Sequence, residues 1–114
     1  MVGCKSLKEL DVSNFNTSNV INMSYMFSTC LSLEKLDVKN FDTSSVTAMK
    51  GMFNYCRALK ILDISNLFVI NDNTNYQDIF FNIYSNIKIK TTRNTADKLI
   101  NNTDLTSSNF EIIE

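Results

Sequence analysis

The sequence contains no histidine, no proline and no tryptophan, and it has only two glycines in 114 residues. The absence of histidine excludes His-assisted serine or cysteine catalysis and the usual ligand sets of zinc sites. Gly3 and Gly51 lie far apart, so they form no glycine-rich phosphate-binding loop. We therefore expect a protein that is not an enzyme and that binds neither a cofactor nor a metal.

Strong charge and long apolar runs are also missing. The formal net charge is −1, with 11 basic and 12 acidic residues, so no basic patch invites nucleic acid. The sequence has no apolar run long enough to span a bilayer, and Met1 does not lead into a signal peptide. We expect no membrane insertion by this segment, and any export signal would lie outside it. A hydrophobic content of 44% is ordinary for a globular domain.

The dominant feature of the sequence is a repeat in which equivalent positions stand at i, i+26 and i+52. Cys4, Cys30 and Cys56 follow this period, and the same shift relates Asp11, Asp37 and Asp63 as well as several leucines. Such self-similarity predicts repeated supersecondary units that bury their apolar faces by stacking on one another. We call each unit a coil.

Each coil is predicted to contain one strand. In residues 7–12, Leu10 and Val12 alternate with Glu9 and Asp11, which is the period of a strand buried on one face. The equivalent segments of successive coils would pair as a parallel sheet with a spacing of about 4.8 Å.

The remainder of each coil is predicted to form a corner and a short helix. Residues 14–19 are rich in side chains that hydrogen-bond to local backbone, and Phe15 and Phe41 are expected to point into the core. Offsets of 3, 4 and 7 then favour a helical or 3₁₀ segment over residues 23–30 and 49–56. A short extra strand over residues 20–23 is the alternative.

The repeat becomes irregular in the last third of the chain, where one residue is inserted before Ile79. We assign residues 1–82 to three coils, the third irregular, and residues 83–114 to a C-terminal cap. The cap is predicted to contain a strand over residues 87–90, a helix over residues 96–101 with Thr95 as N-cap and Asp97 in its first turn, and a strand over residues 110–113.

The predicted fold is thus an α/β repeat: a short solenoid of the leucine-rich-repeat type, with one parallel strand and one short helix per coil. Because the chain begins inside a coil, we expect it to be the C-terminal end of a longer array. An uncovered first coil would favour end-to-end self-association.

The segments LDVSNFNTSNVINMSYMFSTCLSL and LDVKNFDTSSVTAMKGMFNYCRAL resemble the repeats of BspA-like leucine-rich-repeat surface proteins and lipoproteins of bacteria. The resemblance covers residues 4 to about 66. It implies display outside the cell, adhesion to extracellular protein ligands, and no catalysis.

The exposed side of the predicted sheet is the candidate binding face, because its residues are not needed by the core and solenoids commonly bind proteins there. The candidate residues are Glu9, Asp11, Ser13, Lys35, Asp37, Lys39, Ile61, Asp63 and Ser65. The acidic row of Asp11, Asp37 and Asp63 would be compensated by lysines at positions 35, 39 and 60 or by backbone amides. A bound cation is the alternative.

The three cysteines are expected to form a buried ladder of thiols, and a redox pair is the alternative. Three functions remain open at this point. The chain is a surface-displayed protein-binding or adhesion module, a structural spacer or self-assembling stalk, or the recognition region of a larger effector enzyme.

Overall fold

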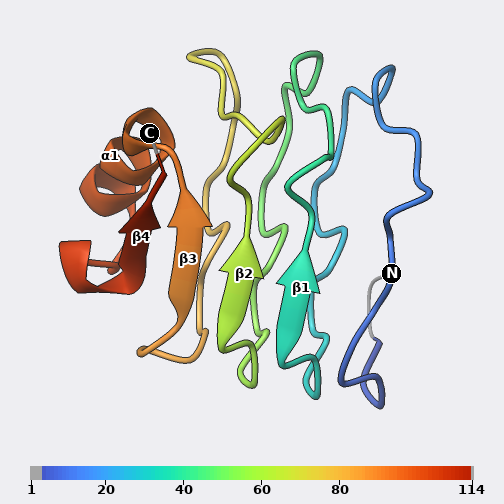
Figure 1. Cartoon of the computed structure of the whole chain (residues 1–114), viewed down its shortest axis with the longest axis vertical. Coiled ribbons are helices and arrows are strands. Elements are labelled where there is room, and N and C mark those ends of the chain that lie inside the picture. Colours follow the sequence, from blue (N-terminus) through green and yellow to red (C-terminus); the bar gives the residue numbers. More distant parts are fainter. Residues whose placement is uncertain (1–3, 114) are drawn as a thin grey trace.

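A computed structural model describes residues 4–113 as a small α/β domain with a four-stranded parallel sheet in the order β1-β2-β3-β4. The four strands lie side by side and point the same way, and an α-helix lies beyond the last strand (Figure 1). The elements are β1 (Lys35–Asp37), β2 (Ile61–Asp63), β3 (Lys88–Thr91), α1 (Arg93–Asn102), a 3₁₀ turn (Ser107–Asn109) and β4 (Phe110–Ile112). The predicted parallel sheet is confirmed.

The sheet follows the sequence period. Leu36 of β1 pairs with Leu62 of β2 one period later, whereas Leu62 pairs with Ile89 of β3 at an interval that is longer by a single position. The first coil contributes only an isolated bridge between Glu9 and Lys35, so the predicted strand over residues 7–12 is wrong. A segment at the edge of a sheet has a neighbour on one side only, which leaves fewer backbone hydrogen bonds to hold it extended.

The longer interval before β3 locates the inserted residue. Asn66 still donates to the side chain of Asn40, its equivalent one regular period earlier. Phe68, however, packs 6.5 Å from the ring of Phe53, much as Phe41 packs 6.3 Å from that of Phe27. Phe68 therefore takes the place of Phe41, and the intervening Leu67 is the extra residue, with its side chain 49% exposed.

The predicted helices over residues 23–30 and 49–56 are wrong, because both segments are runs of tight turns. Tyr25 and Thr29 have positive φ values of 61° and 63°, which a right-handed helix cannot accommodate. Alternate amides instead donate to the next coil, as from Phe27 to the carbonyl of Met52 at 2.9 Å. Only an isolated bridge between Asn22 and Ala48 corresponds to the alternative strand over residues 20–23.

Stacked phenyl rings run through the core from coil to coil. The ring of Phe53 lies 5.7 Å from that of Phe27 and 5.3 Å from that of Phe80, and each pair is nearly parallel. Phe41 is buried, as predicted, but Phe15 is 45% exposed, which corrects the expectation that both point inward. Phe15 stacks only on Phe41, since no coil covers its other side in the described part of the chain.

The C-terminal segment extends the sheet and covers its end. The predicted strand at residues 110–113 is confirmed as β4, which pairs in parallel with β3. The predicted N-cap at Thr95 is wrong: α1 begins at Arg93, and its N-cap is Thr92, whose hydroxyl accepts from the amide of Thr95 at 3.5 Å. Asp97 consequently lies outside the first turn of α1.

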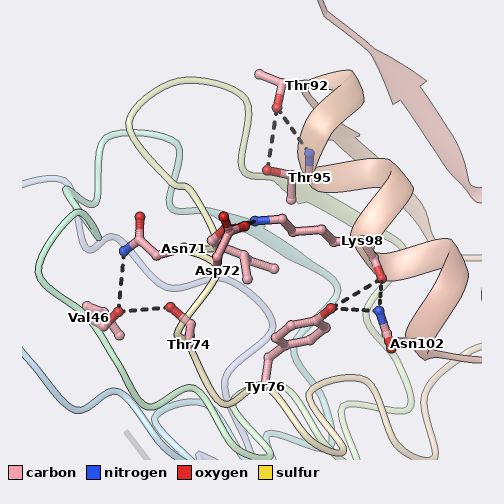
Figure 2. A network of polar contacts seen from close by, with 10 residues as sticks. Val46, Asn71, Asp72, Thr74, Tyr76, Thr92, Thr95, Lys98 and Asn102 are labelled. Carbon is pink, nitrogen blue, oxygen red and sulfur yellow. Dashed lines mark hydrogen bonds and ion pairs between the residues drawn. The ribbon is translucent and has the colours of Figure 1, made fainter.

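A polar network fastens α1 to the third coil (Figure 2). The ammonium of Lys98 extends from the helix, donates to the carbonyl of Ile70 and pairs with Asp72 at 3.0 Å. One turn later, Asn102 donates to the hydroxyl of Tyr76 at 2.7 Å. These contacts hold the helix against the core, where Leu99 is fully buried.

Candidate functional site

The nine residues of the predicted binding face belong to three consecutive coils, of which the first pairs with β1 only through the bridge from Glu9 to Lys35. The side chains between them point into the core. Leu36 and Leu62 are buried, whereas the neighbouring positions of β1 are exposed. The nine residues form three rows across the strands: Glu9, Lys35 and Ile61; then Asp11, Asp37 and Asp63; then Ser13, Lys39 and Ser65.

A groove of about 560 Å³ lies on this face, which we call the strand-face groove. Its lining residues are Glu9, Leu10, Asp11, Lys35, Leu36, Asp37, Ile61 and Asp63. Six of these were predicted from the sequence, whereas Leu10 and Leu36 were missed because their alternation marks them as core residues. Ser13, Lys39 and Ser65 do not line the groove.

Local hydrogen bonds hold the carboxylates of the acidic row. The Oδ1 atom of Asp63 accepts from the amide of Ser65 at 3.0 Å and from its hydroxyl at 2.6 Å. Asp11 accepts from the amide of Ser13 at 3.0 Å, and hydrogen bonding by the Ser13 hydroxyl and amide lowers the pKa of Asp11. The aspartate thus recurs because it closes the turn after each strand.

One lysine supplies the positive charge in the middle of the row. The ammonium of Lys39 lies 2.7 Å from Asp37 and 4.0 Å from Asp63. Partial burial opposes ionisation of Asp37, but hydrogen bonds from the side chain and amide of Lys39 outweigh it and lower the pKa of Asp37. The hydrogen bond from Lys39 to Asp37 in turn raises the pKa of the lysine. The predicted compensation by lysine and backbone amides is confirmed, with Lys39 as the cation.

Within residues 4–113, no three or more acidic or cysteine side chains are grouped so that they could hold a metal ion. The alternative of a cation bound along the acidic row therefore has no support from the geometry.

Two lysines of β3 extend the first two rows of the face and were not among the residues predicted from the sequence. The lengthened interval places Lys88 beside Ile61 and Lys90 beside Asp63, and Lys90 in turn lies beside Glu111 of β4. The alternation of residues 87–90 indicated a strand, but its register against β2 depends on the single inserted residue. The exposed sheet face therefore extends to β3 and β4.

The three cysteines lie within the described chain, where they carry thiols and form no disulfide, so the redox pair is not found. The predicted buried ladder is confirmed for Cys30 and Cys56, whereas Cys4 is only partly buried. Cys30 and Cys56 are fully buried, and the thiol of Cys56 donates to the carbonyl of Phe27 at 3.0 Å. Burial raises the pKa of Cys30 and raises that of Cys56 to about 12. Thiols in this state are packing groups rather than nucleophiles.

Among the described residues, no helix has the length and apolarity needed to cross a membrane.

The sequence matches one known protein family. No curated protein and no solved structure matches the chain. The model of one family, described as Mycoplasma protein of unknown function, DUF285, matches residues 1–97. Since this match covers most of the sequence, the chain belongs to the DUF285 family of Mycoplasma proteins of unknown function.

Proposed function

We propose that the chain is a non-catalytic protein-binding module and that its ligand contacts the exposed strand face. The observation that carries the proposal is a contrast between positions of the repeat. Buried positions recur from coil to coil, as at Leu36 and Leu62, whereas one exposed row changes from Glu9 to Lys35 to Ile61. Side chains that differ where packing does not constrain them are available for recognition.

We extend the proposal to the type of repeat that the coils form. Coils that pair in register at nearly equal intervals along the sequence support a short solenoid of the leucine-rich-repeat type. Together with the resemblance to BspA-like repeats, this supports display at the surface of a bacterial cell and adhesion to an extracellular protein.

The test is binding to a panel of purified extracellular-matrix proteins by surface plasmon resonance. The face variant replaces Glu9, Lys35 and Ile61 with alanine, since these residues have no part in the turns. The matched control replaces Ile21, Lys50 and Gln77 on the side formed by the tight turns.

We expect the face variant to lose at least tenfold in affinity for any protein that binds, and the control to retain the affinity of the unmodified chain. The proposal is refuted if no protein binds or if the two variants behave alike.

Self-association is a second candidate, favoured by the outer side of the first coil. Leu7 and Phe15 are 44% and 45% exposed there, although their equivalents in the next coil, Leu33 and Phe41, are buried. A stalk or spacer would form if this side paired with a second copy of the chain. Sedimentation equilibrium tests it: we expect oligomers that Phe15→Asp dissociates, and a monomer at all concentrations excludes this function.

A further inference from the structure

The charges on the exposed sheet face are unevenly distributed across the strands. Two acidic side chains, Glu9 and Asp11, lie on the first coil, and two lysines, Lys88 and Lys90, lie on β3. Between these ends, Lys39 neutralises Asp37, and the remaining charges of Lys35 and Asp63 are of opposite sign. The face is therefore negative at one end and positive at the other.

The acidic end is the less compensated of the two. Asp11 forms no ion pair within the described residues, and it accepts a hydrogen bond from the uncharged Ser13. Lys35 lies beside Glu9 in register, yet no salt bridge joins them in residues 4–113. Both carboxylates line the strand-face groove, so a cationic side chain entering the groove would meet them.

An apolar side chain occupies the centre of the face. Ile61 is 49% exposed, although the equivalent positions of the neighbouring strands hold Lys35 and Lys88. It lines the groove together with Leu36. An apolar ligand group placed here would bury surface that is otherwise in contact with water.

At the basic end, the ammonium groups of Lys88 and Lys90 can still donate hydrogen bonds to an anion. The ammonium of Lys88 donates to the carbonyl of Ser108 at 2.8 Å, and that of Lys90 lies 3.9 Å from Glu111. Each ammonium has three donors, so one such contact leaves others available.

The spacing of these three features fits an extended polypeptide. Strand separations of about 4.8 Å place Ile61 roughly 10 Å, and the lysines of β3 roughly 14 Å, from the acidic end. Alternate residues of an extended chain face the same side and are about 6.6 Å apart, so the first, third and fifth residues span roughly 13 Å. The side chains of the peptide are long enough to make up the difference between its spacing and that of the three features on the face.

From this match we propose that an extended peptide segment binds across the strands, in the strand-face groove and over the lysines of β3, which lie beside the groove and not in its lining. A cationic side chain contacts Glu9 and Asp11, an apolar one two residues along contacts Ile61, and an anionic one two residues further contacts Lys88 and Lys90. The inference rests on the proposed function and specifies the chemistry of its ligand.

A second copy of this chain fits the face less well than a peptide does. The strands of the face have only three or four residues, so the exposed sheet measures roughly 15 by 10 Å. That area is far below the roughly 800 Å² per partner that stable protein dimers bury.

The experiment titrates the full chain with the capped peptide Ser-Arg-Ser-Leu-Ser-Glu-Ser and follows backbone amide shifts by NMR. We expect shifts at residues 9–11, 35–37, 61–63 and 88–90. Changing the arginine of the peptide to glutamate, or its leucine to serine, should weaken binding about fivefold, as expected for one exposed charge pair or one partly buried apolar contact.

Reciprocal variants of the chain complete the test. Glu9→Lys/Asp11→Lys should weaken binding of the original peptide about fivefold. The same variant should strengthen binding of the peptide in which glutamate replaces the arginine. Asp97→Lys/Asp104→Lys changes the net charge by the same amount on exposed positions outside the sheet face and should change neither affinity.

Three outcomes would overturn the inference. The first is peptide binding that ignores all these changes. The second is that the peptide does not bind the unmodified chain although a matrix protein binds the face; this outcome leaves the proposed function standing. The third is a dimer of the chain that Glu9→Lys/Asp11→Lys dissociates. If the matrix proteins also fail to bind, the proposed function itself is refuted.

Discussion

Replacing Phe53 with alanine tests whether stacking between coils stabilises this domain. The side chain is fully buried, and its ring lies 5.7 Å and 5.3 Å from two other phenyl rings. Truncation removes contacts on both sides and leaves a cavity, which costs about 4 kcal/mol for a buried phenylalanine. Phe15 provides the matched control, because it is 45% exposed and stacks on one ring at 6.2 Å. Its truncation should cost about 1 kcal/mol.

Urea unfolding followed by circular dichroism measures both variants. With a denaturant slope of about 2 kcal/mol per molar, Phe53→Ala should lower the unfolding midpoint by about 2 M and Phe15→Ala by about 0.5 M. Equal shifts for the two variants would refute the reasoning, because they would mean that Phe15 is as well packed as Phe53.

Three further predictions concern strain, pH and thiol chemistry. Gly51→Ala should lower the free energy of unfolding by about 2 kcal/mol, since φ is +60° and the new Cβ would lie 2.5 Å from Cε1 of Tyr25. In a chain that also carries Tyr25→Ala, the loss should fall to about 1 kcal/mol. An unchanged loss in this double-mutant cycle would show that the contact with Tyr25 does not matter. The pKa of Asp37 is lowered in the folded state, so its stabilising effect is present above about pH 4 and is lost as the pH falls through the folded pKa. In Asp37→Asn, the urea midpoint should therefore fall less than in the unmodified chain as the pH is lowered from about 5 to about 2. Parallel plots of midpoint against pH for the two proteins would contradict this. Cys56, with a pKa of about 12, should resist iodoacetamide at about pH 8 until urea unfolds the chain; labelling of the native protein followed by mass spectrometry would count against its burial.

Particular residues show where the sequence was sufficient for prediction. The parallel pairing of Leu36 with Leu62 follows from an apolar position that recurs at a fixed interval, since only stacking buries it. The candidate face follows from the same alternation. Helices over residues 23–30 and 49–56 were predicted wrongly because offsets of 3, 4 and 7 describe which side chains are buried. A run of turns with left-handed residues buries nearly the same set, with Met26 only partly buried.

The order of the residues was enough to predict stacking in units set by the spacing of the cysteines and leucines, the side of each strand that is buried, and the ladder of cysteines. These features depend on periodicity, which can be read directly from the order of the residues. Only the tertiary structure decided that Leu67 is the inserted residue, that Lys88 and Lys90 join the exposed face, and that Lys39 neutralises Asp37. Register between coils and the partners of a charged side chain depend on how separate segments pack, which no single segment encodes.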